Sequence, residues 1–301
     1  MLTNAHVNAR FLTRLGAVSA VTVGLVVGVA ATPATALPEA ASSYSVVTAG
    51  THSKWFPLHR SSVALGDSYT AGQGAPPYVP GQCLQSKYAG YPTIAALFSV
   101  YRLTENRACS GATIADTAAQ LTVPTPVNGN TALVTLTVGA IDAGSNTVLA
   151  ACGQYPDPGV PPCSTAIDLA TQSLPHVGDE LAVLYETIAT TLPNARVAVL
   201  NYPLLFKPGA DPLGDAINSV TTLLNEEIRV AVDDAVAATG NPKIMHVDVT
   251  QEFAGHAIGD LVPYIAYNPA DLAATENFHP NALGNALGYA RALASDRVFA
   301  R

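Results

Sequence analysis

Residues 62–72 read SVALGDSYTAG, a short apolar run followed by a polar turn between two glycines. The run at 62–66 has the length and composition of a buried β-strand. Ser68 follows where a helix would begin, and Gly66 and Gly72 allow a tight backbone around it. A serine at such a junction presents its hydroxyl and its backbone N–H to a ligand, as an acyl-transfer nucleophile must. The alternative is a serine that only caps the following helix. The motif is not the Gly-x-Ser-x-Gly nucleophile elbow of the α/β-hydrolases, because position 70 is threonine.

Similar apolar runs alternate with helical patterns along the rest of the chain. Further strands are predicted at 131–139, 195–202 and 244–249, with a weaker one at 105–108, and helices at 91–100, 179–191, 212–238 and 280–299. From Ile217 to Val236, apolar residues recur at three- and four-residue steps and form one stripe. Strands alternating with helices predict a parallel sheet covered on both faces, an α/β fold. Ligands of such sheets bind at the carboxyl ends of the strands, where Ser68 is expected.

The composition excludes several classes of protein. The chain has 301 residues, of which 49% are hydrophobic and 12% charged, and its formal net charge is −8. Its apolar content suits a packed core rather than a disordered chain. Only 14 Lys and Arg face 22 Asp and Glu, too few basic residues for a general nucleic-acid binder. The four cysteines form no Cys-x-x-Cys pair, and no His-Glu-x-x-His is present, so neither a metal nor a cofactor is predicted.

The N-terminal segment is typical of a secretory signal peptide. Arg10 and Arg14 precede the apolar run 15–31, and a small-x-small cleavage site follows at 34–36. Residues 1–36 are therefore predicted to be removed, leaving a lead-in at 37–60, a single domain at 61–301 and no stable membrane anchor. The alternative is an anchor retained at the N-terminus, although the run barely reaches the roughly 20 residues that a span needs.

Export makes disulfides the expected state of the four cysteines. Three pairings are possible, and the sequence alone does not separate them. We favour Cys83 with Cys109 and Cys152 with Cys163, because the second pair closes a proline-rich loop that cannot be helical. Free buried thiols are the alternative.

The motif Gly66-Asp67-Ser68 resembles the first block of the SGNH, or GDSL-type, esterases and lipases, and most of all their secreted actinobacterial branch. The resemblance extends over residues 61–299. Segments 108–113, 193–197, 201–203, 253–256 and 276–281 resemble, in order, the second block, three scaffold segments and the last block of that family. This resemblance implies a three-layer α/β/α domain with a flavodoxin-like parallel sheet.

The resemblance also implies roles for individual residues. Ser68 is the expected nucleophile, His279 the expected general base, and the N–H groups of Ser68 and Gly111 the expected oxyanion donors. His279 precedes a Pro-Asn turn that leads into the C-terminal helix, so it can stand on a loop at the same sheet edge as Ser68. Among the other histidines, His256 is the rival worth testing, and a structural role is expected for it.

The last block departs from the family pattern at Glu276. The family usually has aspartate three residues before the histidine, and glutamate stands there in this chain. Its carboxylate is a candidate for orienting the imidazole of His279. A backbone carbonyl is the alternative, since one takes this role in part of the related branch.

The third block departs further, at Ile141. The usual pattern is Gly-Gly-Asn-Asp, whereas residues 139–142 read GAID, so Ile141 replaces an asparagine whose amide donates to the oxyanion. Losing one such donor costs roughly 3–4 kcal/mol, about 100- to 1000-fold in rate, when nothing replaces it. The two backbone N–H groups would remain, and Asn146 is a weaker candidate for the missing donor.

The sequence therefore predicts a secreted, monomeric serine esterase or lipase. Its substrate would be an ester of a lipid, an acylglycerol or an acylated glycan. The alternative is a secreted binding protein of the same fold that has lost catalysis, for which Ile141 is the supporting observation.

Overall fold

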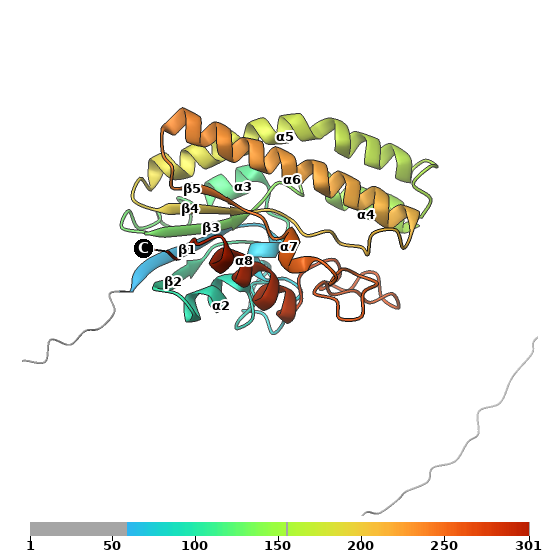
Figure 1. The fold of residues 1–301 in the computed structure, drawn as a ribbon, viewed down its shortest axis with the longest axis horizontal. Coiled ribbons are helices and arrows are strands. Elements are labelled where there is room, and N and C mark those ends of the chain that lie inside the picture. The colour runs from blue at the N-terminus through green and yellow to red at the C-terminus, as the bar shows by residue number, and fades with distance from the viewer. Residues whose placement is uncertain (1–58, 155, 301) are drawn as a thin grey trace, which may run out of the picture. The chain divides into compact units, whose positions relative to one another are not determined.

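A computed structural model describes residues 59–154 and 156–300. The predicted signal peptide, and all but the last two residues of the predicted lead-in, lie outside the described residues. Parallel strands form a five-stranded sheet in the order β2-β1-β3-β4-β5 (Figure 1). The strands are β1 Arg60–Gly66, β2 Tyr101–Asn106, β3 Leu133–Thr137, β4 Arg196–Leu200 and β5 Ile244–Val247.

The apolar runs become strands because a parallel sheet is buried on both faces. β3 is buried at every position, and β4 at all but its first. The weak strand predicted at 105–108 begins earlier, at Tyr101, and lies at the edge of the sheet, where it is partly exposed.

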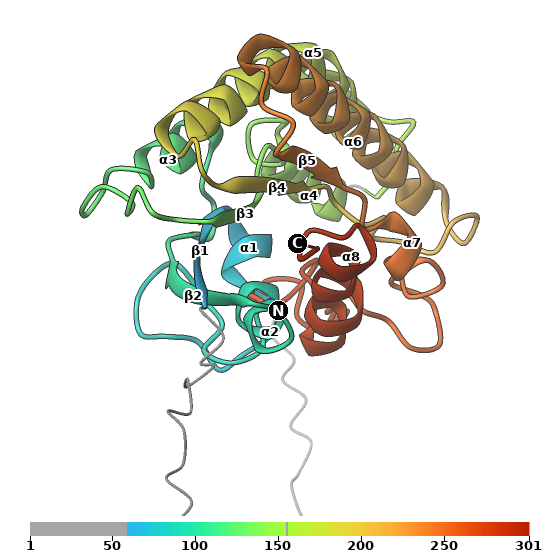
Figure 2. The same ribbon diagram turned by 60° about the vertical axis from the view of Figure 1, so that its left-hand side comes forward.

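Helices cover both faces of the sheet. Their bounds are α1 Ser68–Ala71, α2 Tyr91–Leu97, α3 Ile114–Ala119, α4 Ser145–Gln154, α5 Cys163–Thr191, α6 Pro212–Thr239, α7 Thr250–Phe253, the π-helix η1 Gly284–Tyr289 and α8 Ala290–Ser295. Figure 2 shows α3, α5 and α6 on one side of the sheet and α2 and α8 on the other. This confirms the three-layer α/β/α fold, and the strand order 2-1-3-4-5 is that of flavodoxin-like sheets.

Two helices differ from the sequence prediction. α5 begins at Cys163 rather than at 179, and it continues through Pro175. The helix predicted at 280–299 is divided into η1 and α8. The glycines of η1 pack tightly here, since a Cβ on Gly288 would lie 2.1 Å from the ring of Phe253.

The short helix α3 was not predicted from the sequence. It begins with a capping box formed by Thr113 and Asp116.

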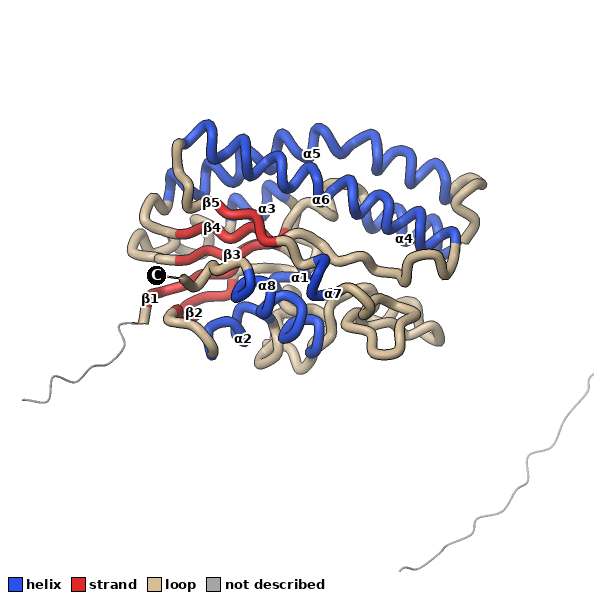
Figure 3. The backbone as a smooth tube through the Cα atoms, in the orientation of Figure 1, coloured by secondary structure: helices blue, strands red, loops and turns tan. Residues whose placement is uncertain are grey.

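The long helices extend past the carboxyl ends of the strands. α5 and α6 have 29 and 28 residues, while the strands have four to seven. Figure 3 shows both helices running beyond the sheet, with α4 beside their far ends. A second core cluster forms there from Val148, Cys152, Cys163, Ala166, Ala170 and Ile217. The disulfide Cys152–Cys163 joins α4 to the start of α5, and Cys83–Cys109 is the other disulfide, so both pairings are those favoured from the sequence.

Within the described residues, no helix combines the length and the apolar composition that a membrane span requires.

Candidate active site

Ser68 is the first residue of α1, directly after the carboxyl end of β1. The N-cap of this helix is Asp67, whose carboxylate accepts hydrogen bonds from the Tyr69 N–H (3.0 Å), the Thr137 hydroxyl (2.6 Å) and the Tyr202 hydroxyl (2.5 Å). Burial raises the pKa of Asp67 to about 6, although these hydrogen bonds act in the opposite direction. Asp67 thereby joins β1, β3 and the segment after β4 beneath Ser68.

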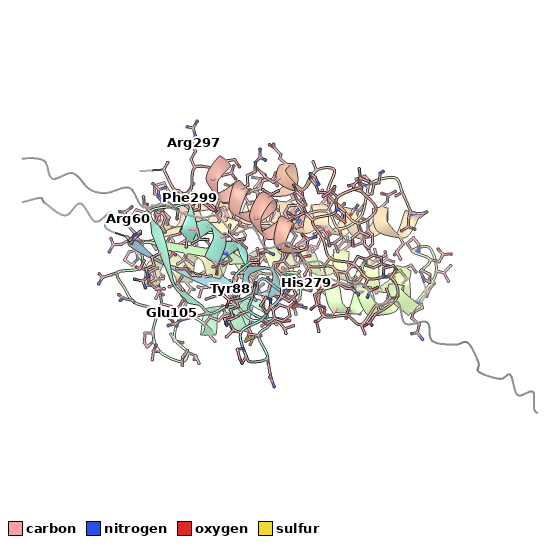
Figure 4. All side chains as sticks on the ribbon, turned by 90° about the horizontal axis from the view of Figure 1, so that it is seen from below. Arg60, Tyr88, Glu105, His279, Arg297 and Phe299 are labelled. Carbon is pink, nitrogen blue, oxygen red and sulfur yellow. A yellow bond between two sulfur atoms is a disulfide. The ribbon has the colours of Figure 1, made fainter. Side chains whose placement is uncertain are left out.

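His279 meets Ser68 across 211 residues of sequence. Its Nε2 lies 2.8 Å from the Ser68 Oγ, and its Nδ1 lies 2.7 Å from the carbonyl oxygen of Asn277. A carbonyl oxygen only accepts, so Nδ1 carries the proton and Nε2 is free to accept one from the serine. Burial lowers the pKa of His279 to about 4, while the Asn277 carbonyl and the charge of Glu276 raise it. In Figure 4, His279 lies well away from Arg60, the residue at which β1 begins.

The backbone around His279 is fixed on both sides. Phe278 has a φ of 62°, a left-handed conformation that is uncommon for a residue other than glycine. Its carbonyl accepts a hydrogen bond from the Tyr69 hydroxyl at 2.7 Å, and its N–H donates to the Ala266 carbonyl at 2.8 Å. The Ala266 N–H in turn donates to the His279 carbonyl at 2.8 Å. These bonds hold the imidazole toward Ser68 and the Nδ1 toward Asn277.

Glu276 does not contact the imidazole through a hydrogen bond. Its carboxylate accepts from the Tyr78 hydroxyl at 3.2 Å, and the position against Nδ1 is taken by the Asn277 carbonyl. Of the two orienting groups considered from the sequence, the structure therefore brings the backbone carbonyl to the imidazole. Glu276 is close enough to act on His279 through its charge alone.

Two residues that line the site have a backbone N–H with no acceptor among the described residues. Gly111 lies in a turn closed by the Ala112 N–H and the Cys109 carbonyl (3.0 Å), and its φ of 77° favours glycine. Within the described residues, neither the Gly111 N–H nor the Ser68 N–H donates to another group of the chain. Both residues line the same pocket, as an oxyanion hole requires.

The pocket beside Ser68 has a volume of about 210 Å³. Ser68, Gly111 and His279 line it together with other polar residues, among them Ser145, Asn146 and Thr221. Apolar side chains from several elements line it as well, namely Ile141, Val148, Leu149, Ala170, Leu205, Ile217, Val220, Leu224 and Phe278. The overhanging ends of α4, α5 and α6 thus supply much of its wall. Ile141 and Asn146 both line it, the latter from an exposed position in the first turn of α4.

The rival histidine lies outside this pocket. The His256 ring stacks on Tyr264 with centroids 3.8 Å apart, and its Nδ1 lies 2.8 Å from the Val262 carbonyl oxygen. Over the described ranges, no three His, Cys, Asp or Glu side chains gather as metal ligands would.

Sequence reasoning assigned no role to several residues of the site. Tyr69, Thr137 and Tyr202 bind their partners from different elements. Tyr202 stands in segment 201–203, which resembles a scaffold segment of the family, but the resemblance does not identify Asp67 as the partner of its hydroxyl. The Asn277 carbonyl is a backbone group, which every residue possesses.

Comparison with known proteins places the chain in a protein family. A model of the GDSL-like Lipase/Acylhydrolase family matches residues 64–287. The chain belongs to this family. Its similarity extends to proteins named "Lipase" from Streptomyces rimosus (33% identical over 237 residues, 75% of this chain and 83% of that protein) and "Lipase 1" from Streptomyces coelicolor (30% over 233 residues, 75% and 83%).

Solved structures of GDSL-like hydrolases agree with the fold. The extracellular lipase from Streptomyces rimosus aligns with a TM-score of 0.67 and 31% identity, over 79% of this chain and 99% of that one. Phospholipase A1 from Streptomyces albidoflavus NA297 aligns with a TM-score of 0.67 and 28% identity, over the same shares. Family and relatives together make the chain a carboxylic ester hydrolase.

Proposed function

We propose that this GDSL-like hydrolase is a secreted serine esterase or lipase that forms an acyl-enzyme on Ser68, with His279 as general base. The observation that carries this proposal is the 2.8 Å approach of Nε2 to Oγ, with Nδ1 held by a carbonyl. Such a pair is the nucleophile and base of acyl transfer, with the third position filled by a backbone group instead of a carboxylate.

The geometry supports a two-step reaction. In the first step the Ser68 Oγ attacks the ester carbonyl carbon, His279 Nε2 takes the hydroxyl proton, and the oxyanion accepts hydrogen bonds from the Ser68 and Gly111 N–H groups. The C–O bond then breaks, and the imidazolium returns the proton to the leaving alcohol. In the second step His279 deprotonates a water molecule that attacks the acyl-enzyme, and the acid leaves as Ser68 recovers its proton.

The pocket favours an ester with an apolar acyl group. Most of its surface is apolar, and burial against apolar side chains stabilises an alkyl chain by roughly 0.8 kcal/mol per methylene. Relatives named as a lipase and a phospholipase A1 agree with a lipid or acylglycerol substrate. An acylated glycan is the less supported substrate, since most of the pocket surface is apolar.

Secretion is supported by two features of the chain. Residues 1–36 have the order of a signal peptide, and the described residues contain two disulfides, which persist in oxidising compartments. A relative of solved structure is named as an extracellular lipase.

Labelling with a fluorophosphonate probe tests the proposed function. The probe phosphonylates an activated serine with loss of fluoride, so peptide mass spectrometry of the secreted protein should place the adduct on Ser68. Protein unfolded in guanidinium before labelling is the control, because the activation depends on His279 being in place. If the protein hydrolyses no p-nitrophenyl ester and takes up no probe at Ser68, it is a binding protein with this fold instead.

Replacing Glu276 with glutamine is expected to change kcat by no more than about threefold. The Asn277 carbonyl keeps Nδ1 protonated, and glutamine can still accept from Tyr78. In a triad whose base is oriented by a carboxylate, loss of that carboxylate lowers kcat by about 10⁴-fold. The kcat of Glu276→Gln therefore shows which of the two groups orients His279.

The pH profile of kcat/KM is a second readout. His279 acts as a base only when neutral, so kcat/KM should fall as the pH drops through its pKa of about 4.

Without the charge of Glu276, which raises the pKa of His279, the acidic fall should move to lower pH. Glu226→Gln, an exposed change on α6, is the matched control and should leave both readouts unaltered. A loss of 1000-fold or more in Glu276→Gln, with unchanged thermal stability, would assign the orienting role to the carboxylate.

A further inference from the structure

Ile141 lies in a turn whose backbone does not depend on its own side chain. The turn follows β3, and the Ile141 carbonyl accepts a hydrogen bond from the Gly144 N–H at 2.9 Å. Asp142 ties the turn to α3, because its carboxylate oxygens lie 3.1 and 3.2 Å from the Ile114 N–H. A substitution at position 141 therefore leaves the main connections of the turn intact.

The side chain of Ile141 is half-buried in the wall of the pocket that contains Ser68 and Gly111. A β-branched side chain has few rotamers, so its methyl groups form a preformed surface. Val148 and Leu149 of α4 line the same pocket, as do the polar residues Ser145 and Asn146. An alkyl group bound to Ser68 therefore finds Ile141 among several apolar side chains in this pocket.

Two polar side chains that line the pocket, Ser110 and Gln73, already have hydrogen-bond partners. The Ser110 hydroxyl donates to the Gln73 side-chain oxygen at 2.6 Å, and the Gln73 amide nitrogen donates to the Thr275 carbonyl at 2.5 Å. Both residues line the pocket but have partners already. The side chain of Ile141, which lines the same pocket as Ser68 and Gly111, offers no hydrogen-bond donor of its own.

We propose that Ile141 is a specificity-determining residue that makes the rate depend on acyl length, by contacting the first carbons beyond the carbonyl of the group bound to Ser68. The proposal rests on the acyl-enzyme of the proposed function. An acetyl group is too short to use this contact, whereas longer acyl groups gain it in the transition state, so the contact raises kcat/KM for long esters alone.

The test compares kcat/KM for p-nitrophenyl octanoate and p-nitrophenyl acetate. Ile141→Ala removes three carbons from the contact and should lower kcat/KM for octanoate by about 30-fold, with acetate changed by less than about twofold. Ile141→Val removes one carbon and should lower the octanoate value by about threefold. Leu169→Ala is the matched control, because Leu169 is 60% exposed on α5 and does not line the pocket; it should leave both values unchanged.

Ile141→Asn should weaken the preference for the long acyl group. An amide at this position can donate to the oxyanion of both esters, which should raise kcat/KM for acetate by tenfold or more. Octanoate gains the same donor but loses the apolar contact, so the ratio of octanoate to acetate should fall by about as much as in Ile141→Ala. Ethyl and octyl acetate form a second substrate series with a constant acyl group, and their ratio should be the same in all variants.

Two failures are distinguishable. If Ile141→Ala and Ile141→Val lower acetate and octanoate equally while their melting temperatures match the parent, or if the ethyl-to-octyl acetate ratio shifts instead, the inference is overturned. If the parent hydrolyses no ester and Ser68 takes up no fluorophosphonate, the proposed function itself fails. Ile141→Val is small enough a change to remain folded should the other variants unfold.

Discussion

Replacing Ser68 with alanine is expected to lower kcat for p-nitrophenyl butyrate by about 10⁶-fold, the size of loss that accompanies removal of a serine nucleophile. The attacking atom is the Oγ that lies 2.8 Å from the His279 Nε2, and alanine has nothing in its place that can carry an acyl group. The change deletes one atom from a side chain that is 7% exposed. The backbone N–H of residue 68 remains, so the fold and an oxyanion donor persist. Release of p-nitrophenolate by equal amounts of purified protein measures the loss.

A matched serine variant shows whether the effect belongs to the site. The Ser219 hydroxyl is exposed on α6 and donates only to the Asp215 carbonyl of the same helix, at 2.8 Å. Ser219→Ala should therefore keep the parent's kcat and its labelling by fluorophosphonate. Activity of Ser68→Ala within tenfold of the parent, in a preparation free of other esterases, would remove Ser68 from the mechanism.

The layered fold is predictable because burial on both faces leaves a simple pattern. Strands of a parallel sheet become continuous apolar runs, as in β3, which is buried throughout. The edge strand β2 is harder to recognise, because its exposed side admits Arg102 and Glu105 among its six residues. The position of a strand within the sheet, which the local sequence does not encode, therefore determines how clearly it can be identified.

The early start of α5 is not predictable from local preference. Pro175 and Gly178 both disfavour a helix interior, so the pattern predicts a helix only from 179 onward. Gly178 packs closely against α6, since a Cβ at this position would lie 2.6 Å from the Glu227 carboxylate, which would have to move. Tertiary contact between the two long helices therefore outweighs the intrinsic preferences of these residues.

The site is predictable where side chains carry the chemistry and not where the backbone does. Ser68 and His279 stand in recognisable motifs, and the structure brings them to hydrogen-bonding distance. The partner of Nδ1 is a carbonyl whose direction depends on the left-handed φ of Phe278. That conformation is maintained by hydrogen bonds from distant segments, Tyr69 among them. Sequence reasoning could name a carbonyl as one option but had no means of preferring it over Glu276.

Replacing His279 with alanine is expected to lower kcat by about as much as the loss of Ser68, on the order of 10⁶-fold. Without Nε2, no group accepts the Ser68 proton, and the hydroxyl is a weak nucleophile at its ordinary pKa. The same variant should react with fluorophosphonate very slowly, because the probe requires the same activation. Since serine and histidine act as one unit, the double variant Ser68→Ala with His279→Ala should be no slower than either single variant. Steady-state kinetics of the three proteins measure this non-additivity.

His256→Ala is the control that distinguishes a catalytic histidine from a structural one. Its ring stacks on Tyr264 and contacts the Val262 carbonyl outside the pocket, so its loss should lower the melting temperature while leaving kcat within a few-fold of the parent. His279→Ala should show the opposite pattern, a large fall in kcat with a smaller change in melting temperature. If the two variants exchanged these patterns, the base would be His256, and the 2.8 Å contact between Nε2 and Oγ would have no catalytic role. Fully additive losses in the double variant would likewise separate His279 from the activation of Ser68.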